Sequence, residues 1–217
     1  TGTEAETELE NVLFSMRDAL FRLACEDAPF DDKVDRLYRT AKAQQEQYDD
    51  LLFPFPEGED EDADETDEDT ASWSQAFWRE STLTSLLELL LGFEINKDDW
   101  RTLLTGAKAR LPEIIARREA FLQAYQGKRQ EYDNLLTYFL YRHFMKALGD
   151  DAVQDKVQLA LVSTAVIQLL DVYEWLAKGE VTHWAQICIC KAYSREIEYN
   201  EDNTEQLAAF SVLDEME

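Results

Sequence analysis

A chain of 217 residues, 45% of them hydrophobic, can bury a substantial core as one domain or as two small ones. The formal net charge of −25 excludes nucleic acid as a partner, because neutralising phosphates requires clustered Lys and Arg, and it disfavours an anionic membrane surface. Only seven Gly and four Pro argue against an all-β architecture with its many tight turns.

Two helices are predicted at the start of the chain. Apolar residues recur at i, i+3, i+4 and i+7 over residues 9–23, which predicts a helix with one buried stripe. Asp31 or Asp32 is expected to cap a second helix that extends past Tyr48. We therefore predict an N-terminal helical pair over residues 1–53.

The composition changes sharply after this pair. Pro54 and Pro56 stop the helix, and Glu57–Asp69 holds ten acids in thirteen residues. Such a block repels itself and has nothing to bury, so residues 54–71 are predicted to form an exposed acidic loop or linker. An acidic docking strip for a basic partner is the alternative interpretation of the same residues.

From residue 72 the helical pattern resumes and continues to the end of the chain. Pro112 is expected to kink or restart one long segment, and Gly179 to end the next-to-last one. Thr182 is expected to cap a final long helix that includes Ile197. Residues 157–177 are apolar on almost every side, which is typical of the central helix of a domain.

The predicted fold is all-α, an irregular multi-helix bundle of about six to eight helices with an acidic loop. Residues 72–217 form the C-terminal helical bundle in this prediction, as one continuous domain with residues 1–53. The longest apolar run, Leu86–Phe93, is far shorter than the roughly 20 residues that span a bilayer. Three cysteines do not form a disulfide framework, so a reduced, cytoplasmic location is predicted.

The sequence contains no complete active site of a familiar type. His143 and His183 do not have the spacing of metal ligands, and His143 on an apolar stripe is predicted to be a core residue. Cys188 and Cys190 point to nearly opposite faces of a helix, so core cysteines are predicted there rather than a metal site. A glycine-rich phosphate loop and a GxSxG motif are also missing from the sequence.

Two polar-aromatic clusters remain as candidate sites. The first lies opposite the apolar stripe of its helix and consists of Asn134, Tyr138, Tyr141, Arg142 and Met145. The second is the segment 192–203 near the end of the chain. There, α-helical spacing would let Glu198 form an ion pair with Arg195 and accept a hydrogen bond from Ser194. One interpretation of this pair is a binding site for carboxylate or cationic groups, and the other is a structural ion pair that ties the last helix to the bundle.

Three stretches of the chain resemble the C-terminal half of flagellin lysine-N-methylases. The stretches are Ser15-Met16-Arg17-Asp18-Ala19-Leu20 with Asp35-Arg36-Leu37, then Tyr138-Phe139-Leu140-Tyr141-Arg142-His143-Phe144, and finally Tyr193-Ser194-Arg195-Glu196-Ile197-Glu198-Tyr199 with Asn203. Family members usually carry His where this chain has Tyr199, so a proton-transfer role is not expected at that position. The acidic segment resembles an insertion relative to the family.

The resemblance implies transfer of methyl groups from S-adenosylmethionine to flagellin lysines in the cytoplasm. It also implies a metal or iron–sulfur centre, held by an N-terminal cysteine cluster that would precede Thr1 and is not in this chain. The candidate catalytic residues are Tyr193, Arg195 and Glu198. The candidate substrate- or cofactor-binding residues are Tyr138, Tyr141, Arg142, Ser194, Tyr199 and Asn203. No metal ligands are expected.

The leading hypothesis is therefore the C-terminal helical domain of a flagellin lysine N-methyltransferase. The carboxylate of Glu198 would orient the substrate ammonium or accept its proton, and tyrosine faces would contact a cation. The rival hypothesis is a non-enzymatic acidic adaptor or chaperone that binds a basic or secreted partner. A third possibility is that the domain only scaffolds the part of the enzyme that carries the cysteine cluster.

Overall fold

A computed structural model describes residues 4–53 and 72–213, with side chains from residue 7 onward. All regular secondary structure in these ranges is helical, which confirms the all-α prediction. The predicted six to eight helices are too few, because breaks at residues 78–79 and 144–146 divide segments that were expected to be continuous. The predicted acidic loop, residues 54–71, lies outside the described residues.

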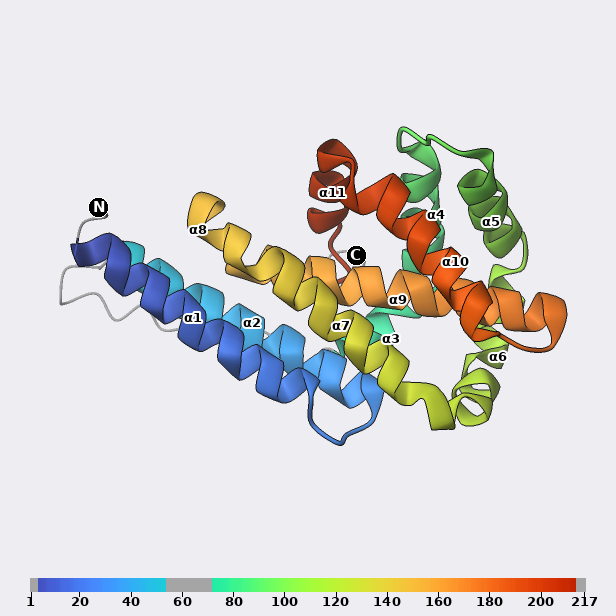
Figure 1. The fold of residues 1–217 in the computed structure, drawn as a ribbon, viewed down its shortest axis with the longest axis horizontal. Helices are drawn as coiled ribbons and strands as arrows, with labels where there is room; N and C mark the ends of the chain where they lie inside the picture. The colour runs from blue at the N-terminus through green and yellow to red at the C-terminus, as the bar shows by residue number, and fades with distance from the viewer. Residues whose placement is uncertain (1–3, 54–71, 214–217) are drawn as a thin grey trace. The chain divides into compact units, whose positions relative to one another are not determined.

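The helices follow one another along the chain as coloured in Figure 1. They are α1 (Glu4–Ala24), α2 (Phe30–Leu52), α3 (Trp73–Phe77), α4 (Glu80–Gly92), α5 (Asp98–Ala109), α6 (Leu111–Ala124), α7 (Arg129–His143), α8 (Ala147–Asp150), α9 (Val153–Lys178), α10 (His183–Tyr193) and α11 (Glu201–Ala208). Short 3₁₀ segments at Gln126–Lys128 and Phe144–Lys146 flank α7, and a π-helical turn at Ser194–Glu198 follows α10.

Contacts between residues divide the chain into two compact units. Among the described residues, the first unit holds those up to Ser74 and the segment Asp133–Leu161, and the second holds Gln75–Tyr132 and the residues from Val162 onward. All three boundaries fall inside a helix, so α3, α7 and α9 each contribute residues to both units. The predicted boundaries, 1–53, 54–71 and 72–217, stay a prediction.

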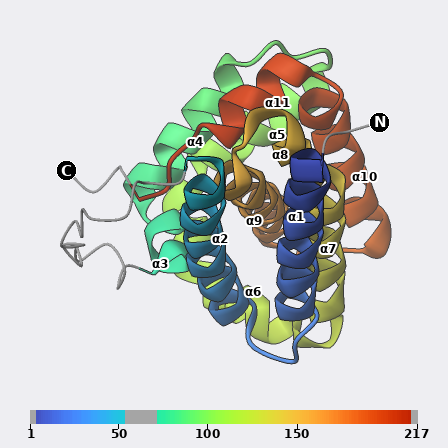
Figure 2. The same ribbon diagram turned by 90° about the vertical axis from the view of Figure 1, so that its left-hand side faces the viewer.

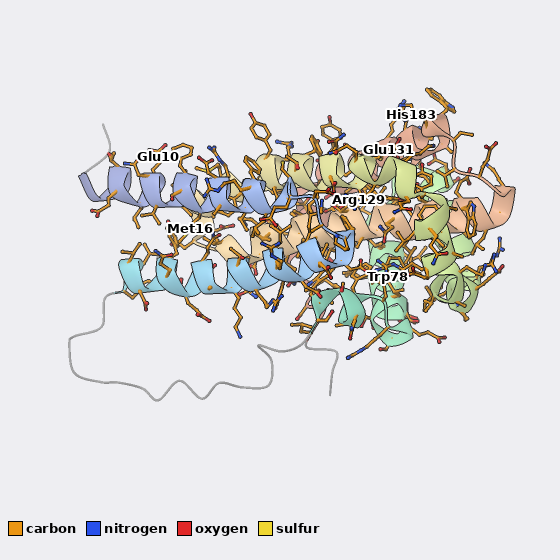
Figure 3. All side chains as sticks on the ribbon, turned by 90° about the horizontal axis from the view of Figure 1, so that it is seen from below. Glu10, Met16, Trp78, Arg129, Glu131 and His183 are labelled. Carbon is orange, nitrogen blue, oxygen red and sulfur yellow. The ribbon has the colours of Figure 1, made fainter. Side chains whose placement is uncertain are left out.

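The first unit is built on an antiparallel pair of helices, α1 and α2, which lie side by side (Figure 2). The apolar stripe of α1 supplies its core, since Leu13 and Leu20 are fully buried. Figure 3 shows Met16 between the two helices and Glu10 on the opposite side of α1. The predicted cap of α2 is wrong: Pro29 occupies the N-cap position, and Asp31 and Asp32 lie in the first turn, where their charges favour the helix dipole.

The second unit surrounds the C-terminal part of α9. Pro112 lies in the first turn of α6 and restarts the chain after α5, as predicted. A Cβ atom on Gly106 of α5 would lie 2.2 Å from the Tyr173 hydroxyl, so glycine is what lets α5 approach α9 so closely. Gly179 adopts a φ of +81°, which ends α9 and turns the chain toward α10.

With 26 residues, α9 is the longest helix of the described chain. By length and composition it is the one described helix that could cross a membrane, but 83% of its most apolar window is buried within the protein. Residues from Val157 to Leu170 are almost all buried. This burial on every side is the pattern of a core helix, which agrees with its prediction as a central helix.

Candidate functional site

The segment Ser194–Glu198 forms a π-helical turn at the end of α10. The helix begins where Thr182 accepts a hydrogen bond from the Ala185 amide at 3.1 Å, which confirms the predicted cap. At its other end the Tyr199 amide donates to the Ser194 carbonyl at 3.1 Å, a bond that spans five residues instead of four. Because this wider turn changes which side chains share a face, α-helical spacing does not apply within it.

The partners of Arg195 differ from the prediction as a result. Its Nη2 donates to Asp99 Oδ1 at 2.6 Å and its Nε donates to Glu196 Oε1 at 2.5 Å, so the expected ion pair with Glu198 is replaced. Glu196 is completely buried, and its Oε2 accepts the Asn96 amide at 2.7 Å. The hydrogen bond with Glu196 raises the pKa of Arg195. Arg195 and Glu196 therefore tie the π turn to the start of α5.

Asn203 and Thr204 of α11 complete this network. The Asn203 side-chain amide donates to the Glu94 carbonyl at 3.2 Å and to the Glu196 carbonyl at 2.8 Å. The Thr204 hydroxyl donates to the Ile197 carbonyl at 2.7 Å. Backbone carbonyls of the irregular turn are thus satisfied by side chains from the next helix. Asn203 is 2% exposed, so it is a buried residue that supports the turn.

Tyr193, Ser194, Glu198 and Tyr199 surround the turn at different depths. Tyr193 is buried: its hydroxyl donates to Ser163 Oγ at 2.6 Å, and its ring meets the edge of Trp100. Burial raises the pKa of Tyr193 far above its usual value, so its hydroxyl keeps its proton. Ser194 and Glu198 are half-buried, whereas Tyr199 is 81% exposed. Only the last three reach the surface of the second unit.

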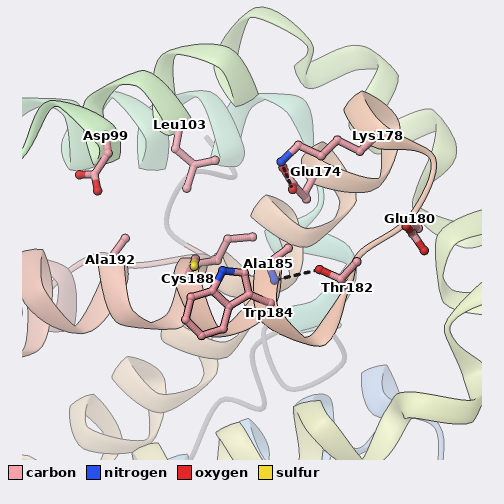
Figure 4. Close-up of a pocket in the computed structure, with 11 residues that line it drawn as sticks. Asp99, Leu103, Glu174, Lys178, Glu180, Thr182, Trp184, Ala185, Cys188 and Ala192 are labelled. Atoms are coloured by element: carbon pink, nitrogen blue, oxygen red, sulfur yellow. Dashed lines mark hydrogen bonds and ion pairs between the residues drawn. The ribbon is translucent and has the colours of Figure 1, made fainter.

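A groove of about 430 Å³ opens beside this network in the same unit (Figure 4). Asp99 links the two, because it both accepts the hydrogen bond from Arg195 and lines the groove. The other lining residues come from α5, the end of α9, the following turn and α10: Leu103, Glu174, Lys178, Glu180, Thr182, Trp184, Ala185, Cys188, Ile189 and Ala192.

The groove combines a negative rim with an exposed indole. Asp99, Glu174 and Glu180 supply three carboxylates, but Asp99 pairs with Arg195 and Glu174 pairs with Lys178, so the net negative charge of the lining comes from Glu180. Lys178 Nζ lies 2.6 Å from Glu174 Oε1 and is already paired. The indole of Trp184 is 72% exposed. A groove with this lining suits a cation, because carboxylates attract it and an aromatic face adds a cation–π contact.

The other predicted cluster lies on α7, in the first unit. Tyr138 is 45% exposed, Tyr141 is 71% exposed, and Arg142 is exposed beside them. The Tyr138 ring meets the edge of Phe139, which faces the core. His143 is buried, as predicted, and burial lowers its pKa to about 4, so it is neutral at pH 7.

Comparison with protein families found one matching model, the FliB lysine N-methylase C-terminal domain, over residues 32–215. The chain belongs to this family. Comparisons with curated proteins and with solved structures found no match. The matched region of this FliB-type domain includes the α7 cluster, the π turn and the groove. It thereby confirms the resemblance that the motifs around Tyr138 and Arg195 indicated.

Four residues of the FliB-type domain that the structure singles out were absent from the predicted site: Asp99, Asp171, Trp184 and Glu196. Glu196 lies inside the recognised motif, but α-helical spacing favoured Glu198. Trp184 follows the predicted cap Thr182, and no sequence pattern indicated that it belongs to a site. Asp99 and Asp171 carry no local signal, since only the folded chain brings them to their partners.

Cys188 and Cys190 are not core residues, contrary to the prediction for this pair. Cys25 and Cys188 are exposed and Cys190 is half-buried. They lie near helix ends or on outward-facing sides of helices. An apolar period of 3.6 residues does not show which side of a helix faces outward when its neighbouring helices are unknown. Within the described ranges, no group of three or more His, Cys, Asp or Glu side chains is placed to hold a metal ion.

A buried acid, Asp171 of α9, lies at the centre of the second unit. Its Oδ2 accepts hydrogen bonds from the Tyr132 hydroxyl and the Gln186 amide, both at 2.8 Å. Its Oδ1 has no donor among the described residues. Burial raises the pKa of Asp171 to about 7, and the two hydrogen bonds only partly oppose this shift. In the unfolded chain an aspartate has a pKa of about 3.9.

This shift predicts a pH dependence of stability. Between pH 4 and 7 the folded chain holds a proton that the unfolded chain has released, so the free energy of unfolding falls as pH rises through this window. Asp171→Asn removes the titration. We expect the stability of this variant relative to the wild type to increase by about 2–3 kcal/mol between pH 5 and pH 8.

Urea unfolding of both proteins at the two pH values measures this difference. Asp202→Asn, at an exposed position on α11, is the control and should show no such trend. A constant difference between Asp171→Asn and the wild type would mean that Asp171 is ionised throughout the range.

Proposed function

We propose that this chain is the C-terminal helical domain of a protein lysine N-methyltransferase that methylates flagellin lysines with S-adenosylmethionine. The observation that carries the proposal is the family match over residues 32–215. The groove beside the Ser-Arg-x-Ile-Glu motif adds support, because the substrate lysine carries a positive charge before it loses its proton. A cytoplasmic location is part of the proposal, since flagellin would be modified before its export.

The chemistry requires a neutral lysine amine. The nitrogen lone pair attacks the methyl carbon, the carbon–sulfur bond breaks with its electron pair passing to sulfur, and a proton leaves the nitrogen. We propose that Glu198, half-buried at the end of the π turn, orients the ammonium or accepts its proton. Arg195 is proposed to act through Asp99, which it holds at the groove.

The other candidate residues have different roles in the proposal. Tyr193 and Asn203 are buried and hydrogen-bonded, so they support the turn from within. Ser194 is proposed to assist Glu198 at the turn. Exposed side chains are proposed to contact the surface of the protein substrate: Tyr138, Tyr141, Arg142 and Tyr199.

S-adenosylmethionine, which the family implies, is the proposed source of the methyl group. The groove does not fit the whole molecule, because the carboxylate of the methyl donor would face Asp99, Glu174 and Glu180, and the one lining cation, Lys178, is already paired. We therefore assign no residue of this chain to the methyl donor. A metal or iron–sulfur centre belongs, in this proposal, to a part of the enzyme outside this chain.

The test is the mass of flagellin. Deleting the gene for this chain should remove the methyl increments from intact flagellin, and restoring the wild-type gene should return them. Restoring Glu198→Ala instead should lower the rate of methylation by roughly 10²–10⁴-fold, the typical contribution of a general base. Glu205→Ala, an exposed carboxylate on α11, is the matched control and should restore wild-type mass.

An unchanged flagellin mass after deletion, in a strain whose flagellin is methylated, would contradict the proposal. It would favour the acidic adaptor, for which binding of a basic partner should weaken steeply with salt. Full methylation with Glu198→Ala would leave the family assignment in place and remove Glu198 from the chemistry. Circular dichroism of each variant separates loss of function from loss of folding.

A further inference from the structure

The groove lined by α5, the end of α9 and α10 has rigid walls. Gly179, with its positive φ, ends α9, and the Thr182 cap starts α10 three residues later, so the two helices diverge from a short turn. The contact of Gly106 with Tyr173 fixes α5 against α9. Arg195 fixes Asp99 from the far side. Three independent local structures therefore hold the lining residues in place.

The lining of the groove has an apolar part and a polar part. The apolar part, which we call the floor, consists of four small or branched side chains: Leu103, Ala185, Ile189 and Ala192. In Figure 4, Asp99 and Glu180 lie at opposite ends of the groove, and Trp184 lies between them on α10. The methylene groups of a lysine side chain fit an apolar floor, and its ammonium fits a carboxylate or an indole face.

We propose that this groove binds a lysine side chain presented by an extended segment of a partner protein. The charge of the lining favours this occupant over an anion, and the apolar floor favours lysine over a small inorganic cation. Lysine also avoids the carboxylate that disfavours the free methyl donor here. The inference rests on the proposed function only in taking that partner to be the protein substrate, and its test requires no methyl transfer.

The three cysteines provide a test in the unmodified chain. Cys188 lines the groove and is exposed, whereas Cys25, at the end of α1 in the other unit, is exposed and far from it in the sequence. Burial, with the nearby Asp171 carboxylate, raises the pKa of Cys190 to about 12, so that thiol reacts slowly at pH 8. Alkylation of Cys188 by iodoacetamide thus reports on the groove, and Cys25 serves as the internal control.

The probe is a short synthetic peptide with one central lysine among Gly and Ser residues, compared with the same peptide carrying Nε-acetyl-lysine. Mass spectrometry of the digested protein follows each cysteine. At a peptide concentration of ten times Kd, alkylation of Cys188 should slow about tenfold, because about nine-tenths of the sites are occupied. The rate at Cys25 should not change. The acetylated peptide should give no protection, since it lacks the charge.

Two variants test whether the protection of Cys188 depends on the residues that line the groove. Trp184→Ala and Glu180→Gln change exposed side chains, so the fold should persist, and each should weaken protection of Cys188 at least about threefold. Glu205→Gln on α11 is the control for a lost negative charge and should bind as the wild type does. Equal protection by the acetylated peptide, no protection at all, or protection by S-adenosylmethionine alone would each overturn the proposal.

The result of the cysteine alkylation experiment can be distinguished from the result of the flagellin experiment. Methyl increments that disappear on deletion, without any protection of Cys188, would keep the methylase function and exclude the groove as its lysine site. Protection without any change in flagellin mass would keep the groove as a site for basic segments and exclude flagellin methylation.

Discussion

Replacing Lys33 with alanine should lower the free energy of unfolding by about 3–5 kcal/mol. Lys33 is completely buried in the first unit, where its Nζ lies 2.5 Å from Asp133 Oδ1 on α7 and 3.3 Å from the Ala24 carbonyl. The Asp133 side chain is only 9% exposed. Removing the ammonium leaves this carboxylate buried without its counter-charge, and that uncompensated charge accounts for most of the loss.

A double variant provides the control for this prediction. Lys33→Met with Asp133→Asn removes both charges and keeps most of the side-chain volume, so it should recover much of the stability lost in Lys33→Ala. Guanidinium unfolding of the three proteins, followed by circular dichroism, measures the difference. If Lys33→Ala unfolds at the wild-type midpoint, Asp133 must be hydrated in solution and the ion pair contributes little.

The second large effect is expected at Glu196. Glu196→Ala should destabilise the second unit by about 3 kcal/mol, because it leaves the Asn96 amide without its acceptor and takes away one of the two partners of Arg195. The loss is at the lower end for a buried pair, since Arg195 is partly exposed and keeps Asp99. Under the proposed function, methylation of flagellin should fall as well, because Arg195 loses the buried partner that orients it toward Asp99 at the groove.

Hydrogen exchange gives this prediction a local measurement. The Asn96 amide should exchange much faster in Glu196→Ala, and less so in Glu196→Gln, whose side-chain oxygen can still accept the bond. The Tyr199 amide, bonded to the Ser194 carbonyl, reports whether the π turn itself persists. Wild-type protection of Asn96 in Glu196→Ala would show that the carboxylate does not hold the loop before α5.

Most of the helices were predictable from the sequence because their evidence is local. The stripe on α1, the continuous apolar surface of α9 and the cap at Thr182 each depend on residues a few positions apart. The same is true of the restart at Pro112. The Pro29 cap of α2 was missed because an aspartate at either of two neighbouring positions satisfied the same rule.

The site was less predictable because its contacts are distant in the sequence. Arg195 and Asp99 are 96 residues apart, and Glu196 and Asn96 are 100 apart, so no local pattern indicates either pair. The motif containing Arg195 was recognised, but its partners were inferred from α-helical spacing that the π turn does not follow. Trp184 was missing from the predicted site because apolar periodicity identifies a face of a helix and does not tell whether another element covers it.

The π turn also makes the number of residues in its segment important for the structure. Successive residues of an α-helix advance by about 100°, so one residue accommodated in a wider turn changes the rotational phase of everything that follows. Glu196 is buried and Glu198 is half-buried only in that phase. Consider two relatives that share these residues but differ by one inserted or deleted position between Tyr193 and Asn200. They would present different carboxylates to the same neighbouring residues, and a comparison of residue identities alone would not reveal this difference.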